Sequence, residues 1–474
     1  MQSGFLARLN QLSFLTAVTG ISLLAGCQID STDESTVEAQ VTVSGNVVTT
    51  WAKIAYDAIS RPLESSTALS TPAVGFTQMT MVQLAVYDIM CALREGDFEP
   101  FSYDEQVRGF PDRDAAIATV SHRILITRIP GRAASVDAQY ATYMAGIADG
   151  NRKTDGIALG EAVAAHYIAL RADDHINDNP IWVQPPIGPG VWQPTLPKPP
   201  VDYKITFVPP FTIGLDEVAS YFPPPPPALT SDLYTQNFIE TTALGRVDSA
   251  IRTPEQTQLA LWTGENSFRW GARNLVELAL AKELNPMRAA RFLAMTVTSQ
   301  SDAFQVGMSA KYHYNFWRPF FAVPLADTDG NPLTIADPTW TPVLNINHPE
   351  YPAGHGFIGG SSLVQSVRAF FRTDTVTWTV GTVGVPGLTE TSRTYTSLEA
   401  MGSDIMLARI FAGLHWRNSV FGAGYSLGTS VTCHVLENNF HRRGHHYRHL
   451  AGCGYDRDHH DNDDDNDEGG YGHH

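Results

Sequence analysis

Proline is concentrated in one part of the chain, and this distribution constrains the fold more than any other feature of the sequence. Of the 30 prolines, 15 lie between residues 180 and 227, a stretch that ends in the run Pro223–Pro227. Proline lacks a backbone N–H and clashes with a preceding helical turn, so this stretch can form neither a regular helix nor a central strand. We therefore predict a Pro-rich connector over residues 177–250 that joins two separately patterned halves.

The segments on either side of this connector carry the pattern of amphipathic helices. Apolar residues recur at i, i+3, i+4 and i+7, and Pro, Gly and Asp fill the loops between them. In the N-terminal half, residues 48–176, helices are expected over 47–59, 76–93, 114–129, 133–148 and 155–172. In the C-terminal half, residues 251–440, helices are expected over 253–264, 272–284, 286–314, 356–372 and 397–438, with a short strand at 374–382. The predicted fold class is all-α, with two helical-bundle halves and minor β-hairpin content.

The composition excludes disorder of the whole chain and argues against a nucleic-acid partner. Hydrophobic residues make up 43% of the chain, enough for a sizeable core, and only 17% are charged. The formal charge is −17, of which residues 456–468 contribute −7 through eight acids and one Arg. The body of the chain is acidic too, so it has no electrostatic footprint for DNA or RNA. We expect residues 441–474, which are rich in His and Asp, to form a disordered tail.

The first 27 residues are typical of a targeting segment. An apolar run from Ser13 to Ala25 is too short to span a bilayer and suits the core of a signal peptide. The run ends in Leu-Ala-Gly-Cys, which resembles a bacterial lipobox in which Cys27 is acylated; a conventional secretory signal is the alternative. We expect an exported lipoprotein of the cell envelope, anchored to the outer membrane or at the periplasmic or extracellular face. Residues 28–47 would then form a linker.

Three short segments concentrate ionisable side chains amid apolar sequence: 311–319 (KYHYNFWRP), 348–356 (HPEYPAGHG) and 409–417 (RIFAGLHWR). Taken singly, each has an ordinary structural explanation: a solvated Lys–Arg face, a capping or core histidine, and an arginine paired with a carboxylate. Together they supply three fixed positive charges, two imidazoles and the start of a helix, with few local acids to neutralise them. The combination predicts a pocket for an oxyanion.

The spacing within two of these segments sets a geometric condition for such a pocket. Lys311 and Arg318 are seven residues apart, so both point the same way if one helix continues through them. Arg409 and His415 are six residues apart, about 240° of helix. These two side chains can converge only if the helix breaks, and Gly413 is the natural place for a break.

The order of the three segments resembles the signature of a known superfamily, the vanadium-dependent haloperoxidases together with the type-2 phosphatidic-acid phosphatases. That signature reads K-x6-R-P, then P-S-G-H, then S-R-x5-H. The corresponding positions here are Lys311-x6-Arg318-Pro319, Pro352-Ala353-Gly354-His355 and Ala408-Arg409-x5-His415. The sequence around the motifs, over roughly 48–440, is similar to that of bacterial haloperoxidases. The ordered triple is specific, whereas any one motif alone is weak.

The resemblance implies a vanadate cofactor whose oxygens meet three cations and a backbone N–H and whose vanadium bonds a histidine. The implied positions are Lys311, Arg318, Arg409, Gly354 and His415. It also implies that His355 acts as the acid–base on hydrogen peroxide and that Lys311 polarises the peroxide for attack by a halide. The substrates would be hydrogen peroxide and halide; an organic acceptor and self-association stay open.

Departures from the signature keep two other functions in view. Ala353 replaces a serine that contacts the oxyanion, and the loss of one hydrogen bond, about 0.5–1.5 kcal/mol, predicts several-fold weaker vanadate binding. Ala408 replaces the other motif serine, with little expected effect. Ser419 stands where phosphatases carry the aspartate that orients the histidine, which favours the peroxidase over an acid phosphatase. The third reading is an inactive oxyanion-binding surface protein.

His348 bears on the choice of halide. Chloroperoxidases of the family carry phenylalanine at this position and bromoperoxidases carry histidine, so the resemblance implies oxidation of bromide or iodide. The alternative is that His348, which precedes Pro349, only shapes the turn.

Overall fold

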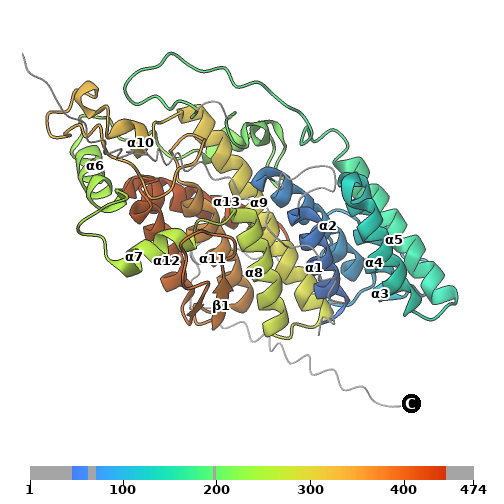
Figure 1. Cartoon of the computed structure of the whole chain (residues 1–474). Coiled ribbons are helices and arrows are strands. Elements are labelled where there is room, and N and C mark those ends of the chain that lie inside the picture. Colours follow the sequence, from blue (N-terminus) through green and yellow to red (C-terminus); the bar gives the residue numbers. More distant parts are fainter. Residues whose placement is uncertain (1–44, 62–70, 196–198, 445–474) are drawn as a thin grey trace, which may run out of the picture. The chain divides into compact units, whose positions relative to one another are not determined.

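The long helix α9 (Pro286–Tyr314) lies near the middle of the fold (Figure 1). It begins where Asn285 caps the backbone N–H of Arg288 and Pro286 takes the first helical position. In the computed structural model, which describes residues 45–61, 71–195 and 199–444, α9 contacts helices from both halves of the chain. The predicted span of 286–314 is confirmed.

The helices of the N-terminal half lie within a few residues of their predicted spans. They are α1 (Val47–Ser60), α2 (Pro72–Ala92), α3 (Arg113–Arg128), α4 (Ala133–Ala145) and α5 (Asn151–Leu170). Helix α3 packs against α2, α4 and α5, and α2 packs along α9. This half therefore covers one side of the central helix.

After the N-terminal half the structure follows the prediction, except for α6 (Asp232–Gly245) and the one-turn helix α10 (Pro319–Ala322). The other α-helices of this part are α7 (Pro254–Trp262), α8 (Ser267–Ala281), α11 (Val364–Phe371), α12 (Leu398–Phe411) and α13 (Tyr425–Asn438). Sequence reasoning missed α6, which lies inside the predicted connector and begins at the N-cap Ser231. The short 3₁₀ helices are η1 (Pro130–Arg132), η2 (Tyr203–Phe207), η3 (Val218–Tyr221) and η4 (Ala326–Thr328).

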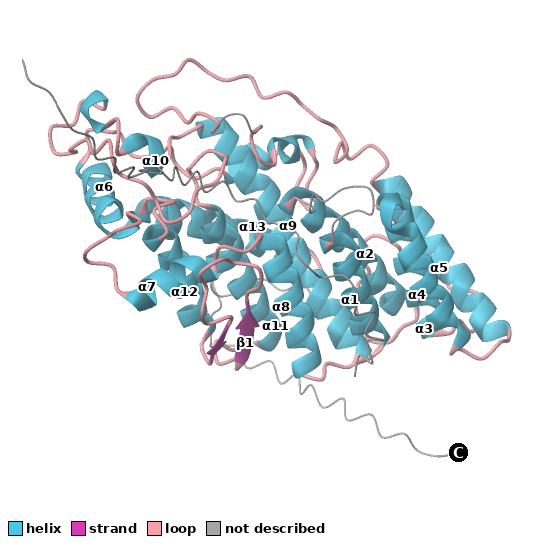
Figure 2. Cartoon of the chain, viewed as in Figure 1, coloured by secondary structure: helices cyan, strands magenta, loops and turns pink. Residues whose placement is uncertain are grey.

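In the described residues the strands form a single small hairpin. Strands β1 (Trp378–Gly381) and β2 (Ser392–Tyr395) pair antiparallel, with Trp378 opposite Tyr395. Figure 2 shows this hairpin against an otherwise helical chain. The predicted all-α class with minor hairpin content is confirmed.

One hydrophobic core serves both halves. A continuous cluster of buried apolar side chains runs from Val47 to Phe440 and includes residues of nearly every long helix. At one close contact, a Cβ on Gly75 of α2 would lie 2.2 Å from the ring of Phe268 in α8, so only glycine lets these helices approach. A second cluster is rich in aromatic residues. It contains Phe316, Trp317 and Trp416, which belong to the first and third ionisable segments.

Two π-helical stretches bring the second and third segments together. They are η5 (Gly356–Leu363), which follows His355, and η6 (Asn418–Gly424), which follows His415. A Cβ on Gly356 would lie 2.6 Å from the Val420 carbonyl oxygen, so glycine permits this contact. Wide π turns are often found at functional sites.

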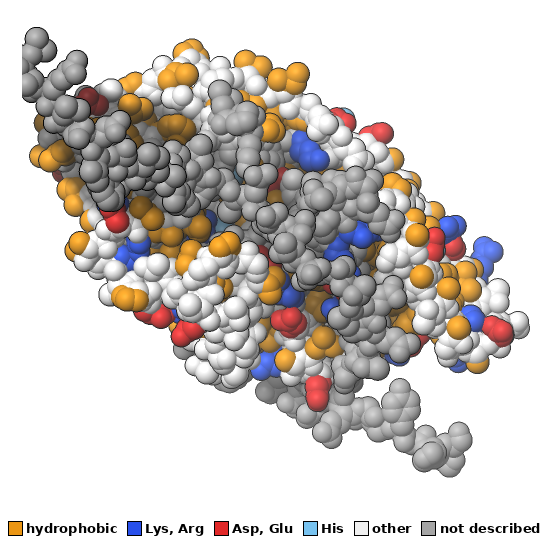
Figure 3. All heavy atoms as spheres, viewed as in Figure 1, with side chains coloured by type: hydrophobic (Ala, Val, Ile, Leu, Met, Phe, Trp, Pro, Cys, Tyr) orange, Lys and Arg blue, Asp and Glu red, His pale blue; other side chains and the backbone are white. Residues whose placement is uncertain are grey.

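The predicted signal peptide over residues 1–27, with Cys27, lies outside the described residues, as do most of the 28–47 linker and of the 441–474 tail. Among the helices that are described, none has the length and apolar character needed to cross a membrane. On the face in Figure 3, charged side chains of both signs are scattered among polar and apolar ones.

Candidate functional site: a buried cationic pocket

The first segment brings Lys311 and Arg318 together, although not in the way the sequence suggested. Helix α9 ends at Tyr314 because Asn315 adopts the left-handed conformation (φ 47°), so the helix does not continue to Arg318. Instead the chain turns back and Arg318 becomes the residue before α10. Both cations then reach the Pro349 carbonyl oxygen, Lys311 Nζ at 3.1 Å and Arg318 Nη2 at 3.4 Å.

The third segment breaks where the sequence predicted. Helix α12 ends at Phe411, and Gly413 takes a positive φ of 72° that a side chain would strain. A Cβ on Gly413 would also lie 2.5 Å from the Gly245 carbonyl oxygen. The turn lets Arg409, in the last turn of α12, and His415, after the break, face the same pocket. Burial, Arg318, Lys311 and Arg409 all lower the pKa of His415.

The second segment supplies the start of a helix beside Lys311. The helical conformation begins at Gly354, so its backbone N–H has no partner within the helix. A Cβ on Gly354 would lie 4.0 Å from Lys311 Cε. His355 follows; burial and the nearby Arg409 and Lys311 lower the pKa of its ring, and the backbone of Thr263 opposes this effect. Thr263 also accepts hydrogen bonds from Arg409 Nη1, at 2.9 Å to its carbonyl and 2.8 Å to its hydroxyl.

His348 lies inside the cluster. Its Nδ1 is 3.0 Å and its Nε2 3.5 Å from Arg318 Nη2, and the His348 carbonyl accepts from Arg318 Nε at 2.6 Å. Burial and the nearby Arg318 and Lys311 hold the pKa of His348 well below its usual range. The ring of His348 therefore lies directly against one of the three cations of the cluster.

Sequence reasoning missed Glu350, which is wholly buried at the centre of the site. Its Oε1 accepts a hydrogen bond from His415 Nδ1 at 2.7 Å and from the backbone N–H of Trp416 at 3.1 Å. Burial raises the pKa of Glu350 to about 7, against the opposing effects of Lys311 and Arg318. The sequence did contain a signal for this residue. Glu350 is an acid within the HPEYP segment, and the chain has Ser419 where phosphatases carry the orienting aspartate.

The electrostatics of the pocket favour an anion. Burial, reinforced by Arg318, lowers the pKa of Arg409 to about 9, and burial lowers that of Arg318 to about 10. Burial and the neighbouring cations also hold the pKa values of Lys311, His355 and His415 well below their usual ranges. Burying several positive charges together costs free energy unless an anion binds among them.

The donors fit an oxyanion. Among the described residues, Lys311, Arg318 and Arg409 form no salt bridge, and the buried Nε of Arg409 has no partner. His415 commits Nδ1 to Glu350, which leaves Nε2 as the nitrogen available to a ligand. Ala353 and Ser419 are buried beside these groups, joined by a 3.0 Å bond from the Ala353 N–H to the Ser419 carbonyl. No group of three or more His, Cys, Asp or Glu side chains that could hold a metal cation occurs in the described ranges.

Fold and pocket together define a class: a helical-bundle protein with a buried cationic site for an oxyanion. Residues 291–442, which carry all three motifs, match the family model described as the VCPO second helical-bundle domain. The resemblance to vanadium-dependent haloperoxidases expected from the sequence is confirmed by this match and by the similarities that follow.

The vanadium chloroperoxidase of Curvularia inaequalis is 26% identical over 203 residues, an alignment that covers 33% of this chain and 32% of that protein. The chain thus aligns with about a third of this relative's length. The crystal structure of the first bacterial vanadium-dependent iodoperoxidase has a TM-score of 0.68 at 19% identity, covering 84% of this chain and 97% of that one. A holo-type bacterial vanadium-dependent chloroperoxidase has a TM-score of 0.61 at 15% identity, with 77% and 90% covered. These solved structures share the fold.

Proposed function

We propose that this protein is a vanadate-dependent haloperoxidase that oxidises a halide with hydrogen peroxide to hypohalous acid. The observation that carries the proposal is a histidine whose Nδ1 is fixed by Glu350, together with three buried cations that form no salt bridge with any residue the structure describes. Vanadate carries negative charge on several oxygens, so it matches the charge and the donors that this pocket presents. The matched family and the solved relatives are vanadium haloperoxidases, in support of the same activity.

The residues divide into those that hold the cofactor and those that move a proton. Lys311, Arg318, Arg409 and the Gly354 N–H would hold the vanadate oxygens, and His415 Nε2 would bond the vanadium. Bound vanadate supplies Lewis-acid activation of hydrogen peroxide without a change in its own oxidation state. His355 is neutral because burial and the nearby Arg409 and Lys311 lower its pKa. A neutral imidazole can accept a proton from hydrogen peroxide.

His348 supports bromide or iodide as the halide. Its neutral ring lies against Arg318 and gives the pocket a polar edge at the position where chloroperoxidases carry phenylalanine. Bromide and iodide are oxidised more easily than chloride, so they need less activation from an apolar wall.

Phosphoester hydrolysis is the second candidate, and Glu350 is the observation that favours it. An attacking histidine must be held by an acceptor at its other nitrogen. Glu350 provides that acceptor, so the absence of an aspartate at Ser419 does not exclude the phosphatase.

A paired assay on the purified protein separates these functions. One arm follows bromide- and iodide-dependent halogenation of a dye with hydrogen peroxide, with and without orthovanadate and with phosphate as competitor. The other follows hydrolysis of p-nitrophenyl phosphate. We expect vanadate-dependent halogenation that phosphate suppresses, lost in His415→Ala and retained in the control His175→Ala, whose side chain is exposed.

Other outcomes would reassign the protein. Hydrolysis inhibited by vanadate, without halogenation, would make it a phosphatase. Vanadate binding without either activity would make it an inactive oxyanion-binding protein.

We further propose that the protein is an exported lipoprotein of the bacterial cell envelope. The apolar run before Leu-Ala-Gly-Cys27 supports this, because it suits a signal peptide cleaved before an acylated cysteine. Labelling with a fatty-acid analogue should tag the wild-type protein and not Cys27→Ser. Labelling of both proteins, or of neither, would overturn the proposal.

A further inference from the structure

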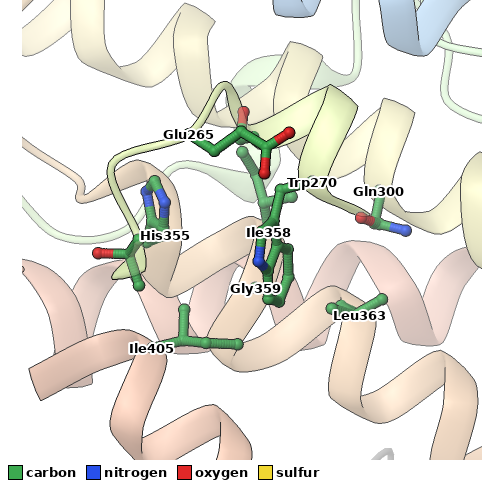
Figure 4. Close-up of a pocket in the computed structure, with 10 residues that line it drawn as sticks. Glu265, Trp270, Gln300, His355, Ile358, Gly359, Leu363 and Ile405 are labelled. Carbon is green, nitrogen blue, oxygen red and sulfur yellow. The ribbon is translucent and has the colours of Figure 1, made fainter. Parts of the chain in front are cut away.

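A second pocket borders His355 and differs in character from the cationic site. Figure 4 shows it between His355 at one side and Gln300 at the other, with Trp270, Ile358, Leu363 and Ile405 among its walls. None of the three cations lines it. The free space is narrow, with room for water-sized molecules and not for an aromatic ring. Its walls are mostly apolar.

Gln300 places an unsatisfied acceptor in this pocket. The side chain is 1% exposed, and its Nε2 donates to the Thr296 carbonyl oxygen at 3.1 Å, which fixes the orientation of the amide. The Oε1 atom then has no hydrogen-bond partner among the described residues. A Cβ on Gly271 would come within 2.8 Å of it, so glycine keeps the space around the oxygen clear. A buried acceptor without a donor costs about 1–3 kcal/mol, so an O–H group is expected there.

The same pocket is unsuited to anions. The carboxylate of Glu265, at its rim, is already committed to Arg273, with N–O distances of 2.7 and 2.8 Å, and to the Val383 N–H at 3.0 Å. A halide entering here would lose its hydration against apolar walls and meet no free cation. A small neutral molecule with O–H donors has no such penalty.

We propose that this pocket holds hydrogen peroxide and delivers it to His355, separately from the anions that the cationic site binds. This rests on the proposed haloperoxidase function. One peroxide O–H donates to Gln300 Oε1 while the molecule waits in the pocket. At the His355 end the second O–H of the peroxide donates to the imidazole, and the molecule passes to the cationic site as neutral hydrogen peroxide. His355 and Thr263 both line the pocket, so the imidazole lies within reach of a molecule held there.

Gln300→Met tests the proposal, because it keeps the length of the side chain and removes the acceptor. We expect kcat/KM for hydrogen peroxide to fall about two- to tenfold, the effect of one lost hydrogen bond. The kcat/KM for the halide and the affinity for vanadate should stay unchanged, since neither depends on this pocket. Equal losses in both kcat/KM values would mean that Gln300 is structural and would overturn the proposal.

The chain offers a matched control in Gln305. It lies on the same helix, is 3% exposed and also has an Oε1 without a partner among the described residues, yet it does not line the pocket. Gln305→Met should therefore leave kcat/KM for peroxide unchanged. A fall equal to that of Gln300→Met would contradict the proposal.

A structural readout separates this proposal from the proposed function. Crystals of the vanadate-free protein soaked in hydrogen peroxide should show a two-atom molecule against Gln300 Oε1, absent in Gln300→Met. Density for water alone would overturn the peroxide site, even if the wild-type protein halogenates. A bound peroxide in a protein without halogenation would uphold the site and reject the haloperoxidase.

Discussion

Glu350 and His415 share a hydrogen bond of 2.7 Å between Oε1 and Nδ1, and neither side chain reaches solvent. The bond determines which imidazole nitrogen faces the pocket. It also supplies what the sequence lacks, since Ser419 stands where phosphatases carry the orienting aspartate. The buried acid that holds His415 thus comes from another segment of the chain.

Loss of this acid should weaken the cofactor site. In Glu350→Ala the His415 ring is free to rotate, so we expect vanadate affinity to fall about 10- to 100-fold, the usual effect of removing an orienting partner of a ligand. Glu350→Gln keeps an oxygen acceptor and should lose less. Titration calorimetry with vanadate measures both. Glu240→Gln is the control, because Glu240 pairs with Arg417 at the surface. Equal affinity in Glu350→Ala and wild type would show that Glu350 does not hold His415.

Restoring the missing motif serine should strengthen the site. Ala353→Ser places a hydroxyl beside Gly354, and one added hydrogen bond of about 0.5–1.5 kcal/mol predicts vanadate binding that is several-fold tighter. Ala408→Ser is a matched control, because it adds a hydroxyl at another fully buried alanine that the resemblance does not assign to the oxyanion. The vanadate affinity of both variants, measured side by side, tests this prediction. If Ala408→Ser gains as much as Ala353→Ser, residue 353 has no special place against the ligand.

Replacing His348 should change the choice of halide. His348→Phe removes the ring nitrogens that lie 3.0 and 3.5 Å from Arg318 Nη2 and leaves an apolar edge. Chloride is strongly hydrated, and an apolar edge offers it no polar group that would hold it away from the reacting centre. We therefore expect the rate ratio of chloride to bromide to rise. Parallel assays with the two halides at saturating peroxide measure the ratio. An unchanged ratio, with vanadate affinity intact, would mean that His348 only shapes the turn.

The sequence predicted most helices because their apolar residues recur at helical spacing, and the three motifs were found because each lies within a few consecutive residues. Prediction from the sequence failed where the structure depends on contacts between residues that are far apart in the chain. Helix α6 was missed because prolines dominate the preceding stretch, although Ser231 offered a cap. The convergence of Lys311 and Arg318 was predicted for the wrong reason, since the left-handed Asn315 ends the helix between them.

Contacts of buried polar side chains with residues far apart in the sequence could not be predicted either. Nothing in the spacing of Glu350 and His415, 65 residues apart, indicates that they bond. The unpaired oxygen of Gln300 is equally invisible in the sequence, because a glutamine in an apolar helix looks like any surface residue. Such relationships depend on tertiary packing rather than on periodicity.

Asp202 should make stability depend on pH. Burial raises its pKa from 3.8 to about 6, so between these values the folded protein keeps a proton that the unfolded chain releases. The contribution of this group is complete below about pH 4 and is lost as pH rises through 6, by roughly 3 kcal/mol. Asp202→Asn, which suits the left-handed backbone at this position (φ 56°), should remove that loss. Urea unfolding at pH 4.5 and 7.5 measures it, with exposed Asp216→Asn as control. Equal pH dependence in wild type and Asp202→Asn would show that Asp202 is ionised in the folded state.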